Sequence, residues 1–382
     1  MELRTFRDTD VKTSLLGLGC MRFLKTGNGE EIDYEPSEKV IDYAYKNGVN
    51  YFDSAYVYNV GDSERVMGKA LSKYPRKSYL IATKIPWMKC GSRQSMLEAF
   101  DEQLERCRTD YIDFYLCHNV NTHSYDAFTQ EHVIPVLKEL KEQGRIRYMG
   151  FSSHGTPDML LDFVQRADWD FVQLQLNYID WTYQDAKRQY EILTERGIPV
   201  MVMEPLRGGR LANLPSESMK NRLLNYSPDA SCASWALRFA ASLPNVQVVL
   251  SGMNDIEQVR DNVKTMSGFK ALSSEEQEIL DATAREFLSL TQVPCTQCGY
   301  CAPHCPQEID IPMLINMYNE YQISRKPLQL VPIARVPEDK RPDKCVACGA
   351  CSNNCPQGID IPRVLSALSD ELRDNPPPAP RS

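Results

Sequence analysis

The chain has 382 residues and a formal net charge of −8, with 42% hydrophobic and 25% charged residues. It is longer than a usual single-core domain, and its composition is ordinary for a folded protein with a sizeable core. The acidic balance and the lack of Lys/Arg clusters argue against binding to nucleic acid or to an anionic membrane. The start lacks the apolar core of a signal peptide, and no run approaches the about 18 apolar residues of a membrane span, so we expect a cytoplasmic protein.

Residues 14–267 alternate short β-branched runs with amphipathic stretches of helical period. Eight runs have the character of strands: LLGLG, VNYFD, SYLIATK, YIDFYLCH, RIRYMGFSS, DFVQLQL, IPVMVME and VQVVLSG. Strands separated by helices form parallel βαβ units. The pattern therefore predicts the α/β class and a (β/α)8 TIM barrel, preceded by a small hairpin within residues 3–14.

Polar residues stand where three predicted strands end. Asp53 closes the second strand, Lys84 the third and His118 the fourth, and Tyr58 follows five residues after Asp53. The chemistry of such barrels collects at the C-terminal ends of the strands. A structural ion pair between the Lys and the Asp, and plain packing of the Tyr and the His, are the alternative interpretations.

A connecting helix is expected over residues 271–290. Ser273 or Ser274 stands three residues before Glu276 or Gln277, which is the spacing of a capping box. The helix separates a barrel domain, residues 1–270, from a C-terminal domain, residues 291–375, and the Pro-rich residues 376–382 are expected to form a disordered tail. We expect the helix to bring the C-terminal domain near the C-terminal mouth of the barrel.

Eight of the thirteen cysteines fall in two runs of the pattern Cys-x2-Cys-x2-Cys-x3-Cys-Pro. In a chain without an export signal this indicates metal binding rather than disulfides. The spacing is that of two [4Fe–4S] clusters, in which the fourth Cys of each run ligates the cluster of the other run. One cluster would take Cys295, Cys298, Cys301 and Cys355, and the other would take Cys345, Cys348, Cys351 and Cys305.

Zinc is the alternative occupant, but zinc usually takes paired Cys-x2-Cys arms. After each run, apolar residues recur with helical period, and Pro312 and Pro362 fall in the first turn of the predicted helices. The C-terminal domain therefore resembles the mainly helical di-cluster ferredoxins more than the small β-rich ones. The five remaining cysteines are expected in the core.

The segments NGVNYFDSAYVYNVGDSERVMGKAL, IATK, DYIDFYLCH, QGRIRYMGFSS and PLRGGRL together resemble the aldo-keto reductase family over residues 3–268. The resemblance implies an NADP- or NAD-dependent enzyme that reduces a carbonyl or oxidises an alcohol. Tyr58 would donate the proton, and Lys84 would stabilise its phenolate. Asp53 would hold Lys84, and His118 would orient the substrate oxygen.

The resemblance also implies a nicotinamide cofactor across the barrel mouth, with Ser152 and Gln175 on the carboxamide. Further implied contacts are Met203, Leu206, Gly208, Gly209, Leu211, Ser251, Gly252, Met253, Asn254, Gln258 and Asn262. The chain departs from the family where many relatives carry Lys and Arg for the 2′-phosphate, because it has Gly252 and Gln258 there. NAD and NADP therefore both stay open. Met203 stands where relatives stack an aromatic ring on the nicotinamide.

Nicotinamides move two electrons as hydride, whereas [4Fe–4S] clusters move one electron at a time. A flavin normally mediates between them, and the sequence shows no recognisable flavin site. Three functions follow: a carbonyl reductase or alcohol dehydrogenase whose clusters exchange electrons or brace the fold, an electron-transfer relay with the barrel as docking platform, and a structural role. The four strand-end residues favour the first. The expected partners are a small carbonyl or alcohol substrate and possible redox partner proteins, with neither nucleic acid nor membrane.

Overall fold

The computed structural model describes residues 1–26, 31–121, 124–290, 293, 295, 301–324, 327–355 and 359–376. The chain forms two compact units. The first comprises Met1–Leu214 and Lys220–Leu280, and the second comprises Pro215–Met219 and Asp281–Ser382. Among the described helices, none combines the length and the apolar character that a membrane crossing requires.

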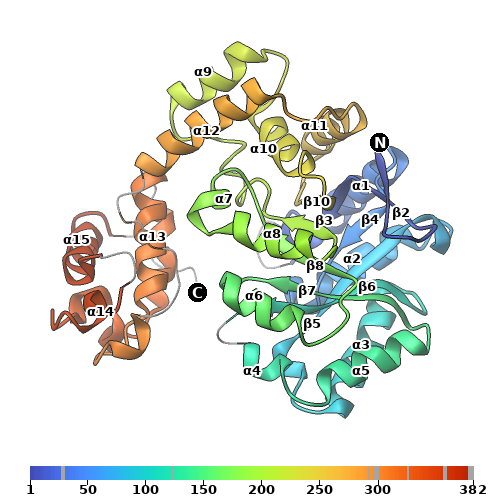
Figure 1. Ribbon diagram of the computed structural model, residues 1–382, viewed down its shortest axis with the longest axis horizontal. Coiled ribbons are helices and arrows are strands. Elements are labelled where there is room, and N and C mark those ends of the chain that lie inside the picture. The colour runs from blue at the N-terminus through green and yellow to red at the C-terminus, as the bar shows by residue number, and fades with distance from the viewer. Residues whose placement is uncertain are drawn as a thin grey trace. The chain divides into compact units, whose positions relative to one another are not determined.

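Eight parallel strands close into a barrel in the first unit (Figure 1). They are β3 (Leu16–Gly19), β4 (Tyr51–Asp53), β5 (Leu80–Pro86), β6 (Ile112–Val120), β7 (Ile146–Ser153), β8 (Phe171–Gln175), β9 (Val200–Met203) and β10 (Val246–Ser251). Each strand pairs with the next in chain order, and β10 pairs with β3 to close the ring. The eight predicted strands and the barrel are confirmed. The predicted hairpin is formed by β1 (Leu3–Thr5) and β2 (Lys12–Ser14).

Helices connect the strands around the outside of the barrel (Figure 1). Those of the first unit and its boundaries are α1 (Tyr34–Lys46), α2 (Asp62–Leu71), α3 (Arg93–Cys107), α4 (Tyr125–Phe128), α5 (Val133–Glu142), α6 (Pro157–Val164), α7 (Asp180–Tyr183), α8 (Ala186–Glu195), α9 (Glu217–Tyr226), α10 (Cys232–Ala241) and α11 (Ile256–Ser267). Several begin at a side-chain cap: Ser92, Thr156 and Ser231 each accept a backbone N–H three residues on. Such a cap stabilises a helix by about 1 kcal/mol.

Alternate strand residues fill the lower half of the barrel interior. The buried cluster there consists of Phe6, Tyr51, Leu80, Ala82, Phe114, Leu116, Phe171, Met201, Val248 and Leu250. Phe6 follows β1 and packs edge-on against Phe114 and Tyr148, with ring centres 5.1 and 4.6 Å away. Because side chains alternate between the two faces of a strand, residues two positions beyond this cluster point into the barrel at its C-terminal end.

Helix α12 (Ser274–Ser289) begins with the predicted capping box. The Ser273 N–H donates to Glu276 Oε2 at 2.9 Å, and the Glu276 N–H donates to Ser273 Oγ at 3.1 Å. The second unit contains α13 (Ile311–Ser324), α14 (Ala350–Asn353) and α15 (Ile361–Asp374). Helices α13 and α15 are the two helices predicted after the cysteine runs, and their apolar faces form one buried cluster.

Candidate active site and cluster-binding cysteines

Strand alternation places the three strand-end residues at one end of the barrel interior. Asp53 follows the interior residue Tyr51 by two positions, and Lys84 follows Ala82 by the same step. On β6 the series Phe114, Leu116, His118 continues inward, two residues short of the last strand residue, Val120. The structure therefore places these three side chains at the same end of the barrel.

Asp53 and Lys84 form a buried ion pair. The Lys84 Nζ lies 2.6 Å from Asp53 Oδ1 and 2.7 Å from the Ser54 carbonyl oxygen. Burial alone would lower the pKa of Lys84, but Asp53 and Tyr58 outweigh it and raise the pKa, so Lys84 stays an ammonium. Burial raises the pKa of Asp53 against the opposing charge of Lys84. The pair fixes a cation at the floor of the site.

Tyr58 lies above this cation, with the Lys84 Nζ 5.0 Å from the centre of its ring. Burial raises the pKa of Tyr58, and Lys84 opposes that shift. The sequence argument considered only the effect of Lys84. With burial included, the phenol holds its proton at neutral pH and Lys84 stabilises the phenolate that forms when the proton leaves.

A tight turn after Tyr58 positions the phenol. Asn59 and Val60 have φ of 49° and 56°, and Gly61 has φ of 85°. A Cβ on Gly61 would lie 2.5 Å from the Cζ atom of Arg106, so another residue would have to displace this guanidinium and also adopt a positive φ, which glycine does without strain. Arg106 in turn donates to the Tyr56 carbonyl oxygen at 3.2 Å, which anchors the chain just before Tyr58.

A β-bulge interrupts β6 at His118 and Asn119. The pairing of β6 with β7 shifts between Cys117 and Val120, and Asn119 has φ of 63°. Bulges re-aim side chains and are frequent beside active sites. The ring of His118 stands edge-on to Tyr58, with centroids 5.5 Å apart. Sequence patterns do not reveal this bulge.

Two imidazoles share this end of the barrel. Burial lowers the pKa of His118 to about 3, and the charges of Lys84 and His154 add to this shift. Burial and Lys84 lower the pKa of His154 to about 4, although this ring is open to the cavity. Both rings are therefore neutral at pH 7, and each carries one N–H donor and one acceptor nitrogen.

A cavity of about 1000 Å³ opens above these residues. Asp53, Tyr58, His118 and His154 line one part of it. Ten of the implied cofactor contacts also line it: Gln175, Met203, Leu206, Gly208, Gly209, Ser251, Gly252, Asn254, Gln258 and Asn262. The other three, Ser152, Leu211 and Met253, are buried in the wall and do not line the cavity. The Ser152 Oγ accepts the Asn119 N–H at 2.7 Å.

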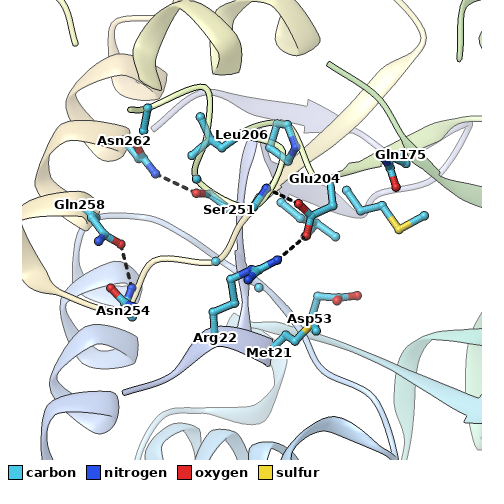
Figure 2. Close-up of a pocket in the computed structure, with 18 of the residues that line it drawn as sticks. Met21, Arg22, Asp53, Gln175, Glu204, Leu206, Ser251, Asn254, Gln258 and Asn262 are labelled. Carbon is cyan, nitrogen blue, oxygen red and sulfur yellow. Dashed lines mark hydrogen bonds and ion pairs between the residues drawn. The ribbon is translucent and has the colours of Figure 1, made fainter. Parts of the chain in front are cut away.

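Several lining side chains hold one another in place (Figure 2). The Asn262 Nδ2 donates to Ser251 Oγ at 3.0 Å, and the Asn254 N–H donates to Gln258 Oε1 at 3.0 Å. Gln175 donates to Asp180 Oδ2 at 3.0 Å and to Gln184 Oε1 at 3.1 Å. The Nε2 group of Gln175 is therefore already engaged.

Gln173 was missed by the sequence reasoning. It precedes Gln175 by one inward step on β8 and lines the cavity, while its buried Oε1 has no hydrogen-bond partner within the described part of the chain. A buried amide oxygen without a partner is costly unless a ligand satisfies it. Gln173 lies two positions after the interior residue Phe171, and this strand alternation is the sequence signal that could have identified it.

Arg22 was also missed. It ends the short helix η1 (Cys20–Arg22) after β3 and reaches Glu204, which directly follows β9. Figure 2 shows the two side chains facing each other, with Arg22 Nη2 3.0 Å from Glu204 Oε1. No pattern in the sequence relates these residues, because 182 positions separate them.

Four of the eight predicted cluster ligands lie around one cavity, which Cys355 of the second run does not line. Cys305, Cys345, Cys348 and Cys351 line one small cavity of the second unit, which fits the ligand set assigned to one [4Fe–4S] cluster. Cys295, Cys301 and Cys355 belong to the buried cluster of the same unit, whereas Cys298 lies outside the described residues. The described cysteines are free of disulfides, and among the described residues no three Cys, His, Asp or Glu side chains are placed as ligands of a single metal ion.

The parallel barrel with polar residues at its C-terminal strand ends and the cysteine-rich unit define a two-part redox protein. Comparison with known proteins agrees. The model of the aldo/keto reductase family matches residues 15–285, and that of a 4Fe-4S dicluster domain matches residues 294–359. The chain belongs to the aldo/keto reductase family and is an oxidoreductase with a 4Fe-4S dicluster domain.

Several known proteins align with more than two thirds of this chain. The L-galactose dehydrogenase of Arabidopsis thaliana is 27% identical over 304 residues, 74% of this chain and 94% of the relative. The NADH-specific methylglyoxal reductase of Escherichia coli is 27% identical over 305 residues, 68% of this chain and 91% of the relative. The solved holo form of aldo-keto reductase AKR11C1 from Bacillus halodurans is 27% identical with a TM-score of 0.62, covering 74% of this chain and 96% of that one.

Proposed function

We propose that the protein is an NADH- or NADPH-dependent reductase of small carbonyl compounds, which also oxidises the corresponding alcohols. The observation that carries this proposal is the set of Asp53, Lys84, Tyr58 and His118 at the wall and floor of one cavity. The names of two relatives, a dehydrogenase of galactose and a reductase of methylglyoxal, support a small carbonyl or alcohol as substrate.

The four residues have distinct tasks in this proposal. Tyr58 gives its hydroxyl proton to the substrate oxygen, where negative charge develops during reduction. Lys84 stabilises the phenolate left behind, and Asp53 keeps Lys84 in place through their 2.6 Å contact. Neutral His118 donates a hydrogen bond to the same substrate oxygen. The nicotinamide, when bound, supplies the hydride.

The cavity offers suitable groups for a dinucleotide. Gln173 has a buried Oε1 without a partner among the described residues, whereas the Nε2 group of Gln175 already donates to Asp180 and Gln184. This difference favours Gln173 over Gln175 as the contact of the carboxamide. The cation next to Gln258, Arg260, forms a 2.6 Å ion pair with Glu257 on its own helix. The negative charge of Glu257 beside Arg260 opposes a 2′-phosphate at that position, which favours NADH over NADPH.

The cysteine-rich unit is proposed to hold two [4Fe–4S] clusters that exchange electrons with a redox partner protein. Cys348 is exposed, and its neighbour Val346 is 58% exposed, so one cluster site is accessible from solvent. This accessibility also supports the second candidate function, an electron relay in which a nicotinamide or another acceptor exchanges electrons with the clusters.

The test uses the full chain, purified without oxygen. A panel of aldehydes and ketones is offered with NADH and with NADPH, while cluster absorbance is followed in the same samples. We expect carbonyl turnover that Tyr58→Phe lowers by about 10² to 10⁴ while nucleotide binding is retained. Tyr56→Phe is the matched control, because the Tyr56 hydroxyl donates to Glu102, away from the cavity.

Two results would decide against the reductase. Full turnover in Tyr58→Phe would reject the assigned proton donor. Bleaching of the clusters by reduced nucleotide, with every carbonyl left unchanged, would favour the relay instead.

A further inference from the structure

His154 is placed at the reacting end of the cavity by the same alternation that places His118. On β7 the series Tyr148, Gly150, Ser152 points into the barrel, and His154 is the next member. The His154 N–H donates to the Val120 carbonyl oxygen at 2.9 Å, which ties the end of β7 to the end of β6. His154 and His118 therefore leave adjacent strands and line the same cavity.

Neither imidazole has a hydrogen-bond partner among the residues that the structure describes. Their neighbours differ in this respect, because Ser152 and Gln175 are both engaged. His132 offers a contrast outside the cavity, since its Nε2 lies 2.8 Å from the Cys90 carbonyl oxygen. The His118 and His154 rings, whose nitrogens have no partner among the described residues, therefore line the same cavity.

The charges around the two rings keep both of them neutral. Lys84 is the cation that acts on each ring, and His154 also acts on His118. Glu204, which directly follows β9, raises the pKa of Tyr58 and forms an ion pair with Arg22. A neutral imidazole is suited to a neutral oxygen ligand, as hydroxyl or carbonyl, because it can donate or accept.

The proposed reduction of one carbonyl oxygen gives His154 no role. Tyr58 and His118 suffice to hold the oxygen of the carbonyl being reduced, as proposed above. We propose that His154 binds a second substrate oxygen, on the carbon next to the reacting carbonyl, so that the site selects α-hydroxycarbonyl and α-dicarbonyl compounds. This inference rests on the proposed carbonyl chemistry and names its substrate class.

Matched substrates isolate the second oxygen. Hydroxyacetone and butan-2-one differ chiefly in an oxygen against a methyl group beside the ketone, and the measured quantity is the ratio of their kcat/KM values. Because intrinsic reactivity is the same for every variant, a change in the ratio reports the protein. We expect His154→Phe to lower the ratio about five- to tenfold, the effect of one neutral hydrogen bond.

Two further variants complete the series. His154→Asn keeps a donor and an acceptor, so we expect it to restore part of the ratio, which simple loss of packing would not do. His132→Asn changes a histidine away from the cavity and is expected to leave the ratio at the wild-type value. An equal ratio in wild type and His154→Phe, with both ketones turned over, would overturn the inference and leave the reductase standing.

If neither ketone is reduced, binding of hydroxyacetone to the protein can still be measured directly. In protein labelled with ¹⁵N-histidine, hydroxyacetone is expected to shift the ring signals that His154→Phe removes, and butan-2-one is expected to shift them much less. No shift with hydroxyacetone would reject the second oxygen site. Shifts without turnover would instead reject the reductase and retain the site.

Discussion

Arg22 and Glu204 join two strand ends across the mouth of the cavity. The Arg22 Nη2 lies 3.0 Å from Glu204 Oε1, and Glu204 also accepts the Gly208 N–H. The stem of Arg22 lies against Gly252 after β10, where an added Cβ would come within 3.2 Å of Arg22 Cδ. The pair therefore sits among the loops that carry the implied cofactor contacts Gly208 and Gly252.

We expect Glu204→Gln to tighten NADH binding about two- to fivefold, because it removes a negative charge and leaves Arg22 free to meet phosphate. Arg22→Met is expected to weaken binding by a similar factor and to reduce its dependence on salt. Fluorescence titration with NADH measures both, and Glu257→Gln, in the Arg260 pair of α11, is the control. Unchanged affinity in both cavity variants would contradict the prediction.

The buried ion pair predicts a large coupling energy. Asp53→Asn or Lys84→Met alone should lower the free energy of unfolding by about 3 to 5 kcal/mol, because each leaves the partner buried without its counter-charge. The Asp53 Oδ2 is already buried without a partner among the described residues, which leaves no second group to compensate. The double variant should cost less than the sum of the two. All four tryptophans precede residue 281, so their fluorescence in urea reports the barrel.

The matched control for that pair is Lys39→Met, which breaks an exposed Lys39–Glu35 contact on α1. We expect no measurable change from it. Additive costs for Asp53→Asn and Lys84→Met would mean that the two side chains do not depend on each other.

Neutral His118 predicts a loss of barrel stability in acid. An unfolded histidine takes up a proton below about pH 6.5, whereas the folded protein keeps the pKa of His118 at about 3. The free energy of unfolding therefore falls as the pH drops from about 6.5 toward 3. Between about pH 7.5 and 5.5, His118 should contribute about 1 kcal/mol of that fall, and His118→Gln should remove this part in urea titrations. Parallel pH dependences of the two proteins would contradict the neutral ring.

If the fourth Cys of each run ligates the cluster of the other run, the effect of Cys305→Ser can be predicted. This change removes the fourth ligand of the cluster held by Cys345, Cys348 and Cys351, with which Cys305 shares a cavity. We expect roughly half of the bound iron and sulfide to be lost, together with the signal of one reduced cluster in electron paramagnetic resonance. Cys232→Ser in α10 of the barrel is the control. Full iron content in Cys305→Ser would refute the assignment.

Much of the fold could be predicted because its signals are local. The eight strands appear as β-branched runs between amphipathic helices, and the capping box at Ser273 and Glu276 needs only a spacing of three residues. The tasks of Gln173 and Gln175 could not be separated in this way. Both point inward from β8, and only the contacts of Gln175 with Asp180 and Gln184 distinguish them.

The sequence by itself determined the barrel, the helices after each cysteine run and the spacing of the thiolates, because hydrophobic period and covalent spacing act over a few residues. Only the tertiary structure decided which distant side chains share the cavity, as with Arg22 and Glu204, and how burial shifts the pKa values of Tyr58, His118 and His154. These properties depend on closure of the barrel, since closure brings the strand ends together and removes water from around their charges.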